Sequence, residues 1–168
     1  MSAFLTDHGS DAMRQGRPLD PESNPGIPNR VRILICDDQK LVRVRIREML
    51  ERDAGVVVIA EAAGGQEAVR LAIRLRPDLI LMDVAMPELD GAEATRQILA
   101  RLPDIRIVAF SADANSESMS RMFAAGARGY LLKSGDPAEV LVSLHRVMSG
   151  NRVISTPQTS PLTWARPD

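Results

Sequence analysis

Three acidic residues and one lysine each come directly after a short apolar run, and their types suggest the chemistry of this chain. The four residues are Asp37 and Asp38, Asp83, and Lys133. Crowded carboxylates repel one another unless a hard cation neutralises them, and Mg2+ takes oxygen ligands of this kind while it keeps some water and substrate oxygens. A nearby ammonium can pair with a phosphoryl oxygen. These residues therefore predict a site for a divalent metal ion and a phosphoryl group.

The apolar runs explain how residues so far apart in the chain could share one site. They are rich in branched residues and lack polar alternation, which is typical of strands buried on both faces of a parallel sheet. Side chains just past the carboxyl ends of such strands converge on one crevice, where open parallel sheets bind ligands. The runs are Val31–Cys36, Asp78–Met82 and Gly129–Leu132.

Strand and helix patterns alternate five times from residue 31 onward. This alternation predicts a parallel sheet with helices on both faces and right-handed crossovers. The expected strands are Val31–Cys36, Val56–Ala62, Leu79–Met82, Ile105–Phe110 and Gly129–Leu132. The expected helices are Lys40–Arg52, Gln66–Leu75, Ala92–Leu102, Ser116–Ala125 and Pro137–Met148, the last of them capped by Asp136.

The two ends of the chain lack this pattern. Residues 1–30 are rich in Gly, Pro, Ser, Asn and Asp, so we expect a flexible leader there. Residues 151–168 contain three prolines and little periodicity, so we expect a tail or linker. The folded domain is predicted over residues 31–150.

Composition limits the protein class. Apolar residues make up 45% of the 168 residues and charged residues 26%, which is ordinary for a soluble globular domain. A net charge of -1 gives no electrostatic case for binding nucleic acid or an anionic membrane. The single cysteine, Cys36, lies within an apolar strand and is expected to be a small buried hydrophobe. Without a membrane-length apolar stretch or a signal peptide, a cytoplasmic location is predicted.

Taken in order, these residues resemble a receiver domain, the response-regulator module of two-component signalling. The matching positions are Asp37-Asp38, Asp83 in LILMDVAMPELDG, Ser111 in VAFSA, and Tyr130 and Lys133 in GARGYLLKS. The likeness covers about residues 31–150. Many receivers have proline after the lysine, whereas Ser134 stands here, a variant similar to receivers of LuxR-type regulators.

The resemblance implies a fold and a function. The fold is the flavodoxin-like (βα)5 doubly wound parallel sheet with strand order 2-1-3-4-5. The function is that of a phosphoprotein switch rather than an enzyme with a separate substrate. A sensor histidine kinase or phosphotransfer protein would donate a phosphoryl group to form an aspartyl phosphate at Asp83.

The resemblance also implies a role for each site residue. Asp38, Asp83 and the backbone carbonyl of Ala85 would bind Mg2+, with Asp37 acting chiefly through a coordinated water. Lys133 and Ser111 would bind oxygens of the phosphoryl group. Movements of Ser111 and Tyr130 would then switch the shape of the domain.

Each residue also has a simpler structural explanation. The acidic pair could cap the first helix, Lys133 could be a solvated strand-end residue, and Ser111 an ordinary turn residue. Tyr130 could be only a core aromatic. The segment Asp90-Gly91 suits a turn and needs no chemistry.

Two other functions remain as alternatives. A haloacid-dehalogenase-like phosphatase also uses an aspartate, Mg2+ and a lysine, but its nucleophile follows the first strand in DxDx[TV], where this chain reads DDQKL. The second alternative is a pseudo-receiver that binds a protein partner without phosphorylation. A histidine-based triad or zinc site has no support, because the two histidines are His8 and His145.

Two helices could present surfaces to partners. The first helix carries a basic cluster that could form a docking face or simply be solvated: Lys40, Arg43, Arg45 and Arg47. The side of this helix expected to face the sheet is apolar and consists of Leu41, Val44, Met49 and Leu50. The last helix has an apolar stripe of Val140, Leu141, Leu144, Val147 and Met148, expected to cover the sheet. Its flank, with Met119 and Met122, predicts a weak homodimer that strengthens on phosphorylation.

Overall fold

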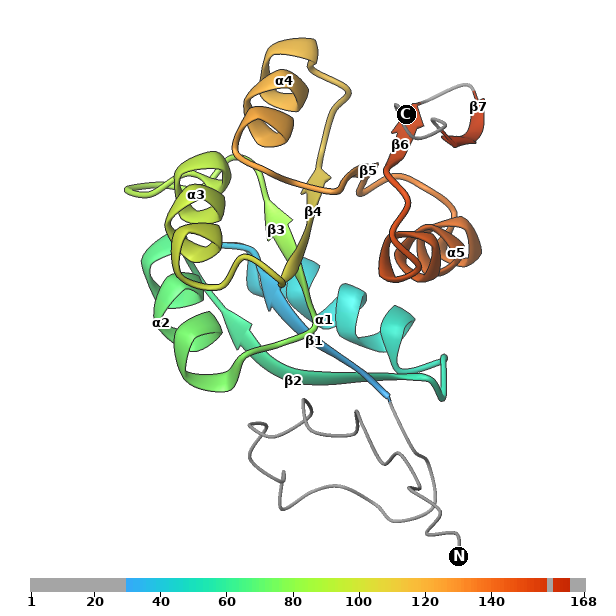
Figure 1. Cartoon of the computed structure of the whole chain (residues 1–168). Coiled ribbons are helices and arrows are strands. Elements are labelled where there is room, and N and C mark those ends of the chain that lie inside the picture. Colours follow the sequence, from blue (N-terminus) through green and yellow to red (C-terminus); the bar gives the residue numbers. More distant parts are fainter. Residues whose placement is uncertain (1–29, 157–158, 164–168) are drawn as a thin grey trace, which may run out of the picture.

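The computed structural model describes residues 30–156 and 159–163, which form an α/β domain around one sheet (Figure 1). The strands are β1 (Val31–Cys36), β2 (Val56–Ala62), β3 (Leu79–Asp83), β4 (Arg106–Ser111), β5 (Gly129–Leu132), β6 (Val153–Thr156) and β7 (Thr159–Thr163). The helices are α1 (Lys40–Leu50), α2 (Gly65–Leu75), α3 (Gly91–Arg101), α4 (Ser116–Ala124) and α5 (Pro137–Met148). None of these helices is both long and apolar enough to cross a membrane.

The sheet has the predicted topology. Its order is β2-β1-β3-β4-β5-β6-β7, and neighbouring strands from β2 to β6 run parallel. The flavodoxin-like order 2-1-3-4-5 is therefore confirmed. The carboxyl ends of β1, β3, β4 and β5 consequently lie at one edge of the sheet, as the clustering of the site residues requires.

Alternate residues of each central strand enter two separate cores. Ile33 and Ile35 pack with α1 and α5, whereas Leu34 and Cys36 pack with residues of α2, α3 and α4 on the opposite face. Figure 1 shows α2, α3 and α4 on one side of the sheet and α1 and α5 on the other. Because helices cover both faces, both sets of side chains must be apolar, which explains the continuous apolar runs.

Strands β6 and β7 were not predicted. The expectation of a tail or linker over residues 151–168 did not include them. Strand β6 pairs with β5 in parallel, Val153 donates its N–H to Arg128 O at 3.1 Å, and the Val153 side chain is buried. Strand β7 pairs with β6 in the antiparallel sense. These strands contain four and five residues, too short for a periodicity signal in a segment rich in proline.

Three of the five helices, α3, α4 and α5, begin at a residue whose side chain caps the helix. Asp136, the predicted cap of α5, accepts a hydrogen bond from the Ala138 N–H at 2.7 Å, and Pro137 occupies the first turn. Asn115 caps α4 in the same way through the Ser118 N–H. Each cap satisfies a backbone donor that has no partner within its helix.

The predicted inner side of α1 was partly wrong. Leu41 is 63% exposed and Val44 is 39% exposed, whereas Ile46 and Leu50 are buried against the sheet. The buried stripe starts from Val42 and Ile46, four residues apart, which turns Leu41 and Val44 toward solvent. By contrast, the α5 stripe packs on the sheet as predicted, with Val140, Leu144 and Val147 buried.

Candidate metal and phosphoryl site

Three carboxylates meet at the carboxyl ends of β1 and β3. One oxygen from each of Asp37, Asp38 and Asp83 can be chosen so that all three lie within 4.8 Å of one another. The Asp37 and Asp83 residues are only 1% and 4% exposed, whereas Asp38 is exposed. Buried carboxylates this close together need positive charge to offset their repulsion and their lost hydration.

Lys133 supplies part of that charge. Its Nζ lies 2.6 Å from Asp37 Oδ2 and 3.1 Å from Asp83 Oδ1. Burial by itself would lower the pKa of Lys133, but the adjacent carboxylates of Asp37 and Asp83 outweigh burial and hold the pKa above its ordinary value. The lysine therefore stays an ammonium ion between the two buried aspartates.

Lys133 alone does not balance the charge of this cluster. Burial raises the pKa of Asp83, Lys133 opposes that rise, and the neighbouring Asp37 adds to it. Among the described residues, the buried Asp37 Oδ2 has no well-angled hydrogen bond, although the Lys133 ammonium lies beside it. Three carboxylates against one ammonium leave a net negative charge, and their oxygens are the ligands that Mg2+ prefers. The residues thus fit a divalent ion.

The backbone around Asp83 is tightly packed against the start of α3. Gly91 donates its N–H to Val84 O at 3.1 Å, and a Cβ at Gly91 would lie only 2.1 Å from Asp83 O. Asp90 caps α3 by accepting from the Glu93 N–H at 2.9 Å. The Asp90-Gly91 turn, which needed no chemistry in the sequence, therefore fixes the backbone of the central aspartate.

The remaining predicted residues surround this cluster. Ser111 is buried at the end of β4, where its carbonyl accepts the Lys133 N–H at 2.7 Å and its hydroxyl accepts the Asp113 N–H at 3.3 Å. Tyr130 is buried in β5 and donates its hydroxyl to Asp113 O at 3.1 Å. Ala85 lies two residues beyond Asp83 in the β3–α3 loop and is exposed.

Arg43 is a residue at this site whose position the sequence analysis did not predict. Its Nη1 donates to the backbone carbonyl of Asp37 at 2.7 Å, and its Nε donates to Glu61 at 3.2 Å. The sequence suggested only a basic cluster on α1. The spacing of Arg43 six residues after Asp37 gave no sign that the helix would bring the guanidinium back to that carbonyl.

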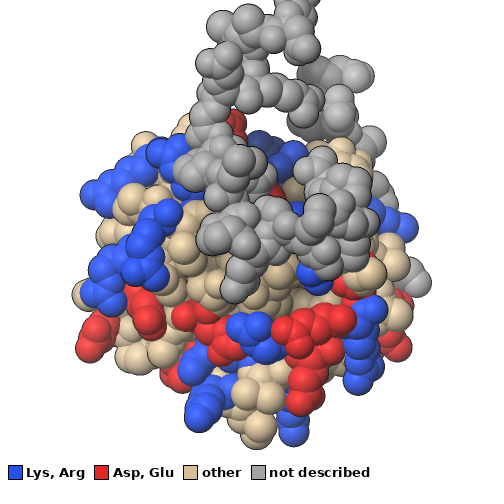
Figure 2. Space-filling model, turned by 90° about the horizontal axis from the view of Figure 1, so that it is seen from below, with Lys and Arg blue, Asp and Glu red and all other residues tan. Residues whose placement is uncertain are grey.

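The structure reduces both surfaces that were expected to bind partners, the basic face of α1 and the dimer surface with Met119 and Met122. Arg43 and Arg47 both bind Glu61, so they are not free members of a docking face, whereas Lys40 and Arg45 are exposed. Met122 is fully buried, so it cannot contribute to the predicted dimer surface. Figure 2 shows one face on which acidic and basic side chains lie side by side rather than in a field of one sign.

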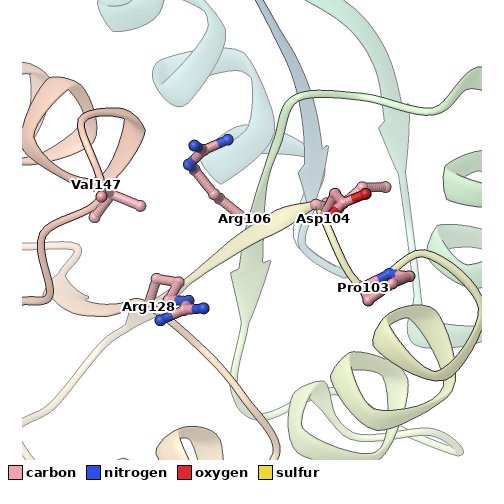
Figure 3. Close-up of a pocket in the computed structure, with 7 residues that line it drawn as sticks. Pro103, Asp104, Arg106, Arg128 and Val147 are labelled. Atoms are coloured by element: carbon pink, nitrogen blue, oxygen red, sulfur yellow. The ribbon is translucent and has the colours of Figure 1, made fainter. Parts of the chain in front are cut away.

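A separate hollow lies at the opposite edge of the sheet. It is lined by the loop before β4, by Arg106 and Arg128 near the starts of β4 and β5, and by Val147 and Gly150 at the end of α5. In Figure 3 the two guanidinium groups point in different directions and do not converge on a common point. This hollow therefore forms no part of the acidic site.

The chain matches the family model of the response regulator receiver domain over residues 33–145. It is 40% identical over 125 residues to the response regulator GacA of Pseudomonas viridiflava, covering 74% of this chain and 58% of that protein. It is 38% identical over 120 residues to the transcriptional regulatory protein LiaR of Bacillus subtilis, covering 71% of this chain and 57% of that protein. The chain thus spans somewhat more than half the length of these relatives.

Solved structures of response regulators have the same fold as this chain. A LuxR-family two-component response regulator from Aurantimonas superposes with a TM-score of 0.72 at 38% identity, covering 77% of this chain and 91% of that one. The receiver domain of the response regulator NarL from Mycobacterium tuberculosis gives 0.69 at 30% identity, covering 73% and 99%. The likeness to LuxR-type regulators is confirmed. The chain belongs to the response regulator receiver domain family of two-component signalling.

Proposed function

We propose that this domain accepts a phosphoryl group on Asp83 from a histidine kinase or phosphotransfer protein and thereby controls an output partner. The observation that carries the proposal is the ion cluster of Asp37, Asp83 and Lys133, beside the exposed Asp38. A buried carboxylate held by an ammonium at the open edge of a parallel sheet suits a nucleophile for phosphoryl transfer.

The transfer is a substitution at phosphorus. An Asp83 carboxylate oxygen forms a new bond to phosphorus as the bond to the donor histidine nitrogen breaks, and the leaving imidazole takes up a proton. Lys133 already lies 3.1 Å from Asp83 Oδ1, where it would pair with an oxygen of the transferred group. Positioning and charge neutralisation of this kind supply most of the catalysis in phosphoryl transfer.

Asp38, Asp83 and the Ala85 carbonyl would hold Mg2+, with Asp37 nearby. When bound, the ion neutralises charge on the phosphoryl oxygens. The chain itself contributes the arrangement of carboxylates, of which two are buried and one faces solvent. This split leaves one open side through which a phosphoryl donor can approach.

The response of the domain would involve Ser111 and Tyr130. A phosphoryl group adds about -1.5 to -2 charges and new acceptor oxygens at the strand ends. The Ser111 hydroxyl, which now accepts the Asp113 N–H, would turn to bind one of those oxygens. Tyr130 is already buried in this structure, so we expect phosphorylation to stabilise the arrangement with Tyr130 inside rather than to create it.

Intact-mass measurement tests the function. The chain is incubated with acetyl phosphate and Mg2+, and we expect a gain of one phosphoryl mass that is absent in Asp83→Asn and in the presence of EDTA. Repeated turnover of a phosphate ester without a phosphorylated product would support the dehalogenase-like phosphatase instead. No change in mass would support the phosphorylation-independent binding module. Labelling of Asp83→Asn would contradict the assignment of the acceptor.

A further inference from the structure

Asp37 is held from several sides, through its backbone and its side chain. The Asp37 N–H donates to Ala62 O in β2 at 3.1 Å, and Asp37 Oδ1 accepts the Gln39 N–H at 2.9 Å. The Asp37 carbonyl accepts from Arg43 Nη1 at 2.7 Å. Because a peptide unit is planar, fixing this carbonyl oxygen also limits the directions that both flanking side chains can take.

Arg43 is itself held in place. Its side chain is only 13% exposed, and its Nε donates to Glu61 Oε2 at 3.2 Å. Burial alone would raise the pKa of Glu61, but Arg47 and Arg43 outweigh burial and keep it below its ordinary value. Glu61 therefore stays ionised at neutral pH and anchors the Arg43 guanidinium, whose planar fork lets it bind Glu61 and the Asp37 carbonyl at once.

We propose that Arg43 is a positioning residue for the acidic pair, which orients Asp37 and Asp38 for a divalent cation through the shared peptide carbonyl. The inference deepens the proposed function and rests on it for the identity of the cation. Groups in contact with metal-binding residues commonly change metal affinity by about 10- to 100-fold when they are removed. For Arg43 we expect an effect at the lower end, because Asp38 is exposed and can partly readjust.

The sign of the effect separates positioning from simple electrostatics. A guanidinium near the acidic cluster repels an incoming cation, so loss of its charge alone would tighten Mg2+ binding. Loss of its hold on the Asp37 carbonyl would weaken binding. A weaker affinity in Arg43→Gln therefore indicates positioning and cannot come from the removed charge.

Arg47 offers a matched control. It lies one helical turn from Arg43 on α1 and binds the same Glu61, at 2.6 Å. Its other partner is the Glu51 carboxylate, whereas Arg43 donates a hydrogen bond to the Asp37 carbonyl. Arg47→Gln removes the same charge and an ion pair to the same carboxylate. The two variants differ in the contact with the acidic pair.

The experiment is a calorimetric Mg2+ titration of the full chain as wild type, Arg43→Gln and Arg47→Gln. We expect about tenfold weaker Mg2+ binding in Arg43→Gln and a change of less than about twofold in Arg47→Gln. Unchanged or tighter binding in Arg43→Gln would overturn the proposal, as would an equal loss in both variants. If the wild type bound no Mg2+, the proposed function would fail.

A second readout tests the positioning without metal. Hydrogen exchange in EDTA should be faster at the Gln39 amide in Arg43→Gln than in the wild type or in Arg47→Gln, because Asp37, whose Oδ1 accepts that N–H, is no longer held through its carbonyl. Equal exchange in all three proteins would overturn the role of Arg43, whatever the outcome of the Mg2+ titration. Thermal unfolding in EDTA then shows whether the two variants are equally stable.

Discussion

Environment gives adjacent aspartates different tasks. Asp37 is buried and lies 2.6 Å from the Lys133 ammonium, whereas Asp38, the next residue, faces solvent. A buried carboxylate is costly without a partner, so Asp37 depends on Lys133 and on the Gln39 N–H. Asp38 carries no such cost and is free to take up a cation.

Removing Asp38 should therefore affect the metal and not the fold. We expect Asp38→Ala to weaken Mg2+ binding by at least about tenfold, because a hard cation loses a direct carboxylate ligand. The melting temperature in EDTA should fall little, since the side chain is exposed. Calorimetric titration and thermal unfolding measure the two effects, and an unchanged Mg2+ affinity would show that Asp38 is not a ligand.

At the scale of elements, the loop between β3 and α3 carries the acceptor backbone. Asp90 caps α3 and also pairs with Arg121 of α4 at 2.5 Å, so it joins two helices next to the site. Burial alone would raise the pKa of Asp90, but the Glu93 N–H and Arg121 outweigh burial and lower it. The ionised form is therefore more favourable in the folded protein than in the unfolded chain.

This lowered pKa predicts a pH-dependent stability. Asp90→Ala should lower the free energy of unfolding by about 1 kcal/mol at pH 7, the usual cost of losing such a cap. The ionic part of this difference is present above the ordinary aspartate pKa of about 4 and should disappear as the pH falls through the lower folded-state value. Denaturant unfolding at several pH values measures it.

Asp90→Asn is the matched control for this prediction. It keeps a capping side chain but loses the ion pair with Arg121, which is partly exposed and contributes little. We therefore expect Asp90→Asn to be less destabilised than Asp90→Ala at pH 7. A difference between wild type and Asp90→Ala that stayed constant from neutral to acid pH would contradict the role of the Asp90 charge.

The elements that the sequence predicted best are those with strong local signals. The central strands were recognisable because they are buried on both faces, and α5 because Asp136 and Pro137 mark its start. The inner side of α1 was misjudged because apolar residues occur on two of its sides, and only packing shows that Ile46 rather than Val44 is buried. Strand β6 depends on pairing with the edge of β5, a long-range contact without a local pattern.

At the scale of the whole molecule, parallel topology makes the site. Residues separated by nearly a hundred positions meet because β1, β3 and β5 all point their carboxyl ends to one edge. The acidic residues and the lysine were therefore predictable from where strands end. Arg43 was not, because its role depends on the distance between a helix side chain and a backbone carbonyl.

Self-association on phosphorylation stays a prediction, for which Met119 rather than the buried Met122 remains available.

The most direct test of the central claim is chemical mapping of the phosphorylated carboxylate. Borohydride reduces an aspartyl phosphate to homoserine, and peptide mass spectrometry then locates the modified position. After treatment with acetyl phosphate and Mg2+, we expect homoserine at position 83 and at no other aspartate, with none formed when EDTA replaces Mg2+. Homoserine at position 37 or 38, or no reduction product in a protein that has gained a phosphoryl mass, would contradict the assignment of Asp83 as the phosphoryl acceptor.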